Sequence, residues 1–396
     1  MKYDFETLVN RTGTGSEKWD MMRAEMPDIP SDIVPFSVAD MEFKPAPEIV
    51  EGLKEYLDMA SFGYTGATDS YYQAIIQFME RRHGFSPKKE WILESAGIVP
   101  ALKQMVAAFT KPEDAVLIMQ PVYYPFMAAV EENKRKLVVS ELLVEENTYR
   151  IDFEDLERKA AHKEVTLLIL CSPHNPVGRV WAKEELIRIC DICLRNQVFI
   201  ISDEIHFDII MPGYTHISMG ALEDKYRNNC AICTAPTKSF NIAGLQVSNL
   251  IIPNKEYRDK ISAARGYYAL NMISYKACEI AYNQCEAWLE EIVVVIDKNR
   301  RLVEEFIKER LPFIKVFELQ GTYLLWLDCS ALGMEAEELE KFMKEKALLF
   351  LDEGYIFGTS GRGYERLNLA CPGWVLTQGL ERLEQAVKKL QAGGIK

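Results

Sequence analysis

The sequence predicts an α/β protein whose core is a mostly parallel sheet, and two observations support this. Between residues 90 and 250, short apolar runs alternate with amphipathic segments, which is the pattern of consecutive βαβ units. The run EVTLLILCS (164–172) is continuously apolar, as expected for a strand that helices cover on both faces. The segment that follows, AKEELIRICDICLRNQ (182–197), carries apolar residues at helical spacing, and VFIISD (198–203) is the next predicted strand.

A helix start follows the first predicted strand of this region, EWILE (90–94). AGIVPALKQM (96–105) places Pro100 early in a helix, where the first turn accepts proline. The amides that open this helix, among them those of Gly97 and Ile98, would point at whatever lies above the turn, which suits a phosphate group. Small-residue helix starts are common, so this motif is weak by itself.

Polar side chains follow three of the predicted strands. Asn175 comes after the run that begins at residue 164, Asp203 ends the next strand, and Lys238 follows CAICTAP (230–236). In open α/β sheets the ligand crevice lies at the carboxyl ends of the strands, so we expect these three residues to converge on one site.

Lys238 is the only charged residue in TAPTKSFNIAGL (234–245). An exposed ammonium is the ordinary interpretation of a lysine, but these neighbours favour a lysine desolvated in a site, where it can form a Schiff base. Asp203 could cap a helix or join an ion pair, and a carboxylate at a buried strand end typically has a cationic partner. A phosphate turn, a strand-end aspartate and a lysine form a far more specific pattern together than any of them alone.

The pattern changes outside the central region. The N-terminal segment is irregular and rich in methionine and proline, and from about residue 288 a long helix begins. Three shorter elements follow it: TYLLWLD (322–328), a helix from about residue 335, and ERLNLAC (365–371). We therefore expect a large α/β domain at 48–287, and a smaller α+β domain formed by 1–47 together with 288–396.

Charge and hydropathy exclude several classes of partner. The 396-residue chain has 46 Lys and Arg against 59 Asp and Glu, a net charge of −13, so we expect no binding to nucleic acid or to anionic membranes. The N-terminus MKYDFETLVN has no apolar region of a signal peptide, and no uncharged apolar run is long enough to span a membrane. We expect a cytoplasmic protein that acts on a small molecule.

The nine cysteines are expected to be reduced thiols. The pairs CDIC (190–193) and CAIC (230–233) together have the spacing of a zinc site. The first pair, however, lies on the apolar stripe of a predicted helix. The second lies in a predicted strand, where residues three apart point to opposite faces. We therefore expect no metal site.

With these motifs in place, the chain resembles the pyridoxal 5′-phosphate (PLP) enzymes of the aspartate aminotransferase fold (fold type I). Within them it is most similar to the MalY/PatB-type and cystalysin-like carbon–sulfur β-lyases. The resemblance runs essentially end to end, and its motifs are SVADMEF, GYTG, AGIVPA, PVYYPF, CSPHNPVGRVW, SDEIHFDIIMPGY, APTKSFNIAGL, DEGYIFG and ERLNLACP.

The resemblance implies a cofactor site with three catalytic residues. Lys238 would hold PLP covalently, Asp203 would pair with the ring nitrogen, and Tyr123 would stack on the ring face. Asn175 would donate a hydrogen bond to the phenolic oxygen, and His206 is either a neighbour of the ligand or a satisfied buried histidine. The phosphate would be bound by Thr237 with the amides of Gly97 and Ile98.

The resemblance also implies a homodimer and a substrate subsite. Tyr64 would reach the phosphate in the neighbouring subunit, so that the two active sites are shared. Arg366 would hold the α-carboxylate of the substrate in a bidentate fork, helped by the backbone near Ala39, with Tyr124 beside the substrate. The implied reaction is α,β-elimination of a sulfur amino acid such as cystathionine or cysteine, which yields pyruvate, ammonia and a thiol.

Two departures from the wider family limit what is carried over. Gln246 stands where many aminotransferases of this fold have an arginine for the phosphate, and no second arginine matches a motif for a distal carboxylate. Both departures favour a lyase over an aspartate or glutamate transaminase. An aminotransferase that uses the same residues is the main alternative, and a regulatory protein that binds a transcription factor is another.

Overall fold

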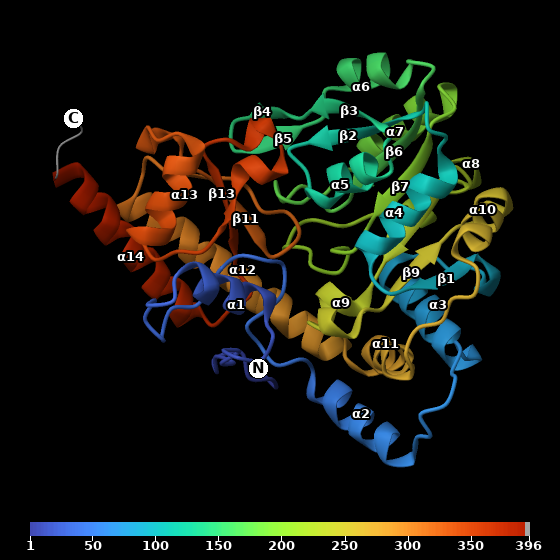
Figure 1. Cartoon of the computed structure of the whole chain (residues 1–396), viewed down its shortest axis with the longest axis horizontal. Helices are drawn as coiled ribbons and strands as arrows, with labels where there is room; N and C mark the ends of the chain where they lie inside the picture. Colours follow the sequence, from blue (N-terminus) through green and yellow to red (C-terminus); the bar gives the residue numbers. More distant parts are fainter. Residues whose placement is uncertain (393–396) are drawn as a thin grey trace.

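The computed structural model describes residues 1–392, and its larger sheet has seven strands in the order β1-β9-β8-β7-β6-β2-β3 (Figure 1). Strand β9 runs antiparallel to both of its neighbours, and the remaining neighbouring pairs are parallel. The predicted α/β class with a mostly parallel sheet is confirmed. The strands are β1 Ile92–Ser95, β2 Ala115–Gln120, β3 Lys136–Glu141, β6 Val165–Cys171, β7 Phe199–Asp203, β8 Cys230–Thr234 and β9 Ser248–Ile251.

Helices cover both faces of this sheet. Because successive strand residues point to opposite faces, Ile200 and Ile201 of β7 belong to two different hydrophobic clusters. The cluster that contains Ile201 is closed by α4 (Ile98–Phe109), α5 (Pro125–Glu132) and α10 (Lys255–Arg265). The other cluster is closed by α3 (Asp69–His83), α6 (Phe153–Ala160), α7 (Lys183–Arg195) and α11 (Met272–Gln284).

A second, smaller sheet is antiparallel, with the order β10-β11-β13-β12. Figure 1 shows it beside the larger sheet, with the long helix α12 running from α11 toward α14. The domain boundaries at 47/48 and 287/288 stay a prediction. The elements are β10 Lys315–Val316, β11 Leu324–Asp328, β12 Asp352–Glu353, β13 Tyr364–Asn368, α12 Glu286–Arg310, α13 Ala336–Glu345 and α14 Gly373–Ala392.

The N-terminal segment departs from the expectation of irregular structure, because it contains helix α1 (Glu17–Glu25). This helix lacks a clear apolar stripe: one of its three buried residues is Lys18, whose amine lies 2.8 Å from Asp40 and 2.6 Å from Glu42. A buried lysine beside Trp19 and Met22 interrupts the apolar pattern, so hydrophobic periodicity does not reveal the helix.

The CxxC pairs lie as the sequence predicts. Cys190 and Cys193 are buried on α7, whereas Cys230 and Cys233 of β8 pack into different hydrophobic clusters, on opposite faces of the sheet. Among residues 1–392, no helix combines the length and the apolar character needed to cross a membrane.

Candidate active site

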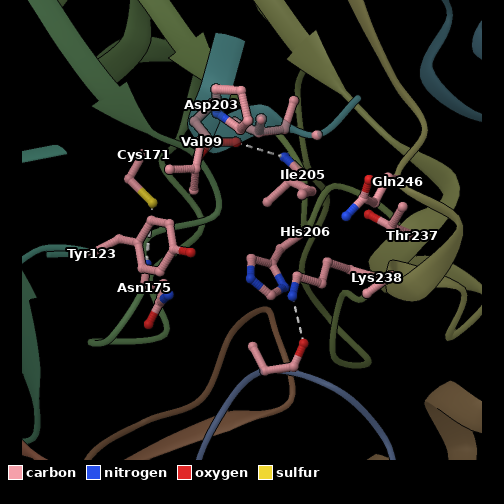
Figure 2. A pocket seen from close by; sticks show the side chains of 15 residues that line it. Val99, Tyr123, Cys171, Asn175, Asp203, Ile205, His206, Thr237, Lys238 and Gln246 are labelled. Carbon is pink, nitrogen blue, oxygen red and sulfur yellow. Dashed lines mark hydrogen bonds between the residues drawn. The ribbon is translucent and has the colours of Figure 1, made fainter. Parts of the chain in front are cut away.

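A cavity of about 190 Å³ lies at the carboxyl ends of β6, β7 and β8. Figure 2 shows the side chains of Tyr123, His206 and Lys238 pointing into it. Parallel strands of an α/β sheet place their carboxyl ends at one edge, so residues distant in sequence meet there. The lining residues are Ala39, Gly97, Ile98, Val99, Pro100, Tyr123, Cys171, Asn175, Asp203, Ile205, His206, Thr237, Lys238, Ala243 and Gln246.

Lys238 is carried by α9 (Pro236–Ser239), a single helical turn that follows β8 and has proline at its start. The next residue, Ser239, donates a hydrogen bond from Oγ to Asp208 Oδ2 at 2.5 Å, and both side chains are buried. This hydrogen bond anchors the turn to Asp208, and the lysine side chain extends toward the cavity.

The Lys238 amine is desolvated, as the sequence predicts. Its Nζ donates to the backbone oxygen of Ala39 at 2.5 Å, and the same oxygen accepts a hydrogen bond from Tyr323 at 2.8 Å. Burial lowers the pKa of Lys238 to about 8, although the nearby Asp40 carboxylate favours the charged form. At pH 7 about a tenth of this amine is therefore the free base that nucleophilic or proton-transfer chemistry requires, far more than of an ordinary lysine.

Asp203 ends β7, and burial raises the pKa of its carboxyl to about 7. The backbone N–H of Ile205 donates to Asp203 Oδ1 at 3.2 Å and partly offsets this effect. A buried carboxylate with so raised a pKa is poised to bind a cationic group that enters the cavity.

The phosphate turn predicted from AGIVPA begins helix α4. Its N-cap, Gly97, has φ 106°, a conformation that favours glycine, and no side chain caps the helix. The first amides of the helix thus remain available to an anion from the cavity. Thr237 and Gln246 line the same cavity. Gln246, which stands where many aminotransferases of this fold have an arginine, therefore does lie at the site.

Tyr123 and Asn175 approach the cavity from β2 and β6. The Tyr123 N–H donates to the Asn175 backbone oxygen at 3.0 Å, and burial raises the pKa of the Tyr123 hydroxyl. The Asn175 N–H also donates to the sulfur of Cys171 at 3.4 Å. These contacts fix the two loops relative to each other.

His206 is buried, and its Nδ1 has no hydrogen-bond partner in the described residues. Its ring lies edge-on to Tyr323, with ring centres 5.7 Å apart. Burial, together with the charges of Lys238 and Arg366, lowers the pKa of His206 well below its ordinary value, so the imidazole is neutral. A buried polar atom without a partner in such a cavity is a position for a ligand contact.

Arg366 lies on β13 next to this cavity and is only 2% exposed. Its Nη1 donates to Asn175 Oδ1 at 2.8 Å, which joins the small sheet to the cavity wall. Its Nε and Nη2 donate to Asp352 Oδ2 at 3.1 and 2.6 Å.

Three residues named from the sequence do not line the cavity, namely Arg366, Tyr124 and Tyr64. Tyr124 is 44% exposed, and its ring packs beside Tyr123 and Phe357. Tyr64 is fully exposed, at 104%, in the loop between α2 (Pro47–Met59) and α3.

Three residues at the site had no role assigned from the sequence, namely Cys171, Tyr323 and Asp352. Each lies inside a quoted or predicted segment: Cys171 ends a strand, Tyr323 is the second residue of TYLLWLD, and Asp352 opens DEGYIFG. The positions of Cys171 and Tyr323 at the ends of predicted strands could have indicated that both lie near the site. Nothing local marks Asp352, because its partner lies on another strand.

Comparison with known proteins places the chain in a family. The family model of class I and II aminotransferases matches residues 31–383. The chain is 41% identical to the cystathionine β-lyase PatB of Bacillus subtilis over 97% of its own length and all of that protein. It is 30% identical to the protein MalY of Escherichia coli, over 98% of its length and all of MalY.

The similarity to a solved structure also covers nearly the whole chain. The PLP-containing cystalysin of Treponema denticola superimposes with a TM-score of 0.97 at 46% identity, covering 98% of this chain and all of that one. The fold, the cavity at the strand ends and these full-length similarities agree, and the chain belongs to the class I and II aminotransferase family, among the relatives of cystathionine β-lyase PatB.

Proposed function

We propose that this protein is a PLP-dependent carbon–sulfur β-lyase that converts cystathionine or cysteine-type amino acids to pyruvate, ammonia and a thiol. The observation that carries the proposal is the partly buried, desolvated amine of Lys238, which shares one cavity with the buried carboxyl of Asp203. The full-length similarity to cystathionine β-lyase PatB supports elimination over amino-group exchange.

The residues present fit this cofactor. Lys238 would hold its aldehyde carbon, Asp203 its ring nitrogen, and Tyr123 its ring face. The uncapped start of α4 at Gly97 and Ile98, together with Thr237, would hold its phosphate, with Gln246 in place of the arginine. Asn175 and His206 would lie at its phenolic oxygen. When bound, the cofactor supplies an electron sink for negative charge at the substrate Cα.

The remaining chemistry falls to side chains of the chain. Arg366 binds the α-carboxylate, assisted by the backbone near Ala39, with Tyr124 beside the substrate. The Lys238 amine takes the Cα proton, the Cβ–S bond breaks, and the thiolate leaves with the bonding electron pair. The proton taken up by Lys238 passes to the thiolate, which gives the thiol and restores the free amine. The remaining enamine reacts with water to give pyruvate and ammonia.

The test is the release of pyruvate from a panel of sulfur amino acids by the cofactor-loaded protein. We expect cystathionine or cysteine to give pyruvate, ammonia and a thiol in equal amounts. If sulfur amino acids give no pyruvate while an amino acid and 2-oxoglutarate exchange their amino group, the protein is an aminotransferase and the lyase proposal fails.

The raised pKa of Asp203 predicts a pH-dependent stability of the cofactor-free protein. Between the ordinary pKa of 3.8 and about 7, the folded protein holds a proton that the unfolded chain has released. The free energy of unfolding therefore falls as the pH rises through this window, and it stays lower above it. Asparagine does not ionise, so the Asp203→Asn variant does not lose stability as the pH rises. We expect its free energy of unfolding at pH 8 to exceed that of wild type by on the order of a few kcal/mol.

Urea unfolding of both proteins at pH 4 and pH 8 measures this effect. The stability difference should be present at pH 8 and nearly absent at pH 4. A difference of equal size at both pH values would contradict the assignment. The same variant should bind PLP more weakly, because it has lost the anionic partner of the ring nitrogen.

The proposed enzyme acts as a homodimer with shared active sites. Tyr64 is fully exposed, and the nearby Met59 and Phe62 are 82% and 77% exposed, so one surface carries several large apolar side chains. Patches of this kind mark contact sites between proteins. A symmetric contact through this loop would bring Tyr64 to the phosphate of the neighbouring subunit.

A mixing experiment tests the shared site. Tyr64→Phe and Lys238→Ala chains, unfolded and refolded together, should form heterodimers in which both changes fall in one site and leave the other intact. About a quarter of all sites should then be wild-type-like, and activity should exceed the sum of the two separate variants. A fully active monomer at high dilution would rule this proposal out. A cytoplasmic location stays a prediction.

A further inference from the structure

Asp352 is the principal partner of Arg366. The two residues face each other across the β12–β13 pair, and Asp352 Oδ2 accepts hydrogen bonds from both Nε and Nη2 of the arginine. The same carboxylate accepts a hydrogen bond from the backbone N–H of Val38, at 3.0 Å to Oδ2 and 3.3 Å to Oδ1. Both side chains are buried, so the ion pair is shielded from water.

These contacts leave part of the guanidinium free. It has five N–H groups, and three are used, one each on Nε, Nη1 and Nη2. One N–H on Nη1 and one on Nη2 have no partner in the described residues 1–392, and a carboxylate can bind Nη1 and Nη2 together through two parallel hydrogen bonds. The ring of Phe357, 4.7 Å from Cζ, covers a face of the group and limits its tilt.

We infer that Asp352 is a positioning residue for substrate recognition: it holds Arg366 in the orientation that presents this free N–H pair to the α-carboxylate. The inference rests on the proposed role of Arg366. Asn175 and Phe357 restrain the arginine from other sides, but only Asp352 holds two of its nitrogens at once.

The contact with Val38 gives Asp352 a second task. Val38 has φ 55°, in the left-handed region that a β-branched residue rarely adopts, and its N–H is held by Asp352. The next residue, Ala39, supplies the oxygen that accepts the Lys238 hydrogen bond. The Asp352 carboxylate therefore contacts both Arg366, which is proposed to bind the substrate carboxylate, and the loop whose Ala39 oxygen contacts Lys238.

A plain counter-ion would behave in the opposite way. If Asp352 only neutralised Arg366, its removal would leave a stronger positive field, and carboxylates would bind more tightly. If it positions Arg366, its removal lets the guanidinium turn, and carboxylates bind more weakly. The sign of the change in affinity separates the two roles.

The probe is 3-(methylthio)propionate, which has a carboxylate and a sulfur but no amine to react with the cofactor. Its binding to cofactor-loaded wild type and Asp352→Asn is measured by isothermal titration calorimetry. We expect the variant to bind about ten- to a hundredfold more weakly, as for a misplaced positioning group. Equal or tighter binding would overturn the inference.

Two further variants guard against a general loss of structure. Glu353→Gln changes the adjacent carboxylate of the same strand, which pairs with Lys344 instead, and it should bind the probe like wild type. Should Asp352→Asn fail to fold, Asp352→Glu keeps the charge but displaces the carboxylate. Weaker binding by that variant supports the inference, and wild-type affinity overturns it.

A double-mutant comparison shows whether Asp352 acts through Arg366. In an Arg366→Lys background, adding Asp352→Asn should cost less than about twofold in probe affinity, because the fork is already lost. A loss as large as in the wild-type background would overturn the inference. Probe binding does not depend on catalytic turnover. If wild type binds the probe but eliminates no sulfur amino acid, the proposed function fails while the inference about Asp352 stands.

Discussion

Replacing Lys238 with alanine is expected to lower kcat for elimination from cystathionine or cysteine by at least about 10²- to 10⁴-fold, the usual contribution of a positioned proton-transfer group. The amine is buried in the cavity, and its pKa of about 8 makes it a competent base near neutral pH. Steady-state pyruvate release by wild type and variant measures the loss.

The variant should lose activity without losing stability. Burying an amine costs free energy, so the cofactor-free alanine chain should unfold at a temperature no lower than cofactor-free wild type. Lys255→Ala, which changes an exposed lysine on α10, is the matched control and should keep full activity. Borohydride treatment of wild type should place the cofactor adduct on Lys238, and an adduct on any other lysine would contradict the site.

Replacing Arg366 with alanine is expected to weaken amino-acid binding by about 2 to 5 kcal/mol, because the lost charge pair would be desolvated. That corresponds to a rise of about thirtyfold to several thousandfold in KM for cystathionine or cysteine. Cofactor binding should be retained, since the residues proposed to hold the cofactor are unchanged.

Arg366→Lys is the companion variant. The alanine change leaves Asp352 buried without its partner, which destabilises the fold, whereas lysine keeps a positive charge there. Lysine cannot present two parallel N–H groups, so most of the affinity should still be lost. A KM within twofold of wild type for both variants would exclude contact between Arg366 and the substrate carboxylate.

The sequence was most informative where a signal is local. Alternating apolar runs predicted the parallel sheet, and polar residues at strand ends predicted that Asn175, Asp203 and Lys238 meet, as they do around the cavity. Strand direction alone decides where these residues lie, so no long-range information is needed.

The sequence was least informative where a residue depends on a distant partner. Helix α1 is stabilised by Lys18 against Asp40 and Glu42, and Asp352 is defined by Arg366 on another strand and by Val38. Of these contacts, the one between Asp352 and Val38 forms only after the N-terminal segment packs against the small sheet. A pattern confined to one stretch of chain does not contain them.

The nine buried cysteines have a practical consequence for work with a thiol-releasing enzyme. All nine thiols are buried, and burial raises the pKa of each. Disulfide exchange needs an accessible thiolate, and Cys171, which lines the cavity, stays a protonated thiol because its pKa is raised. We therefore expect that the native chain neither mixes its thiols with the product nor needs an added reductant. A coloured disulfide reagent should therefore count only released product during turnover, and the protein's own sulfur should become visible only after denaturation.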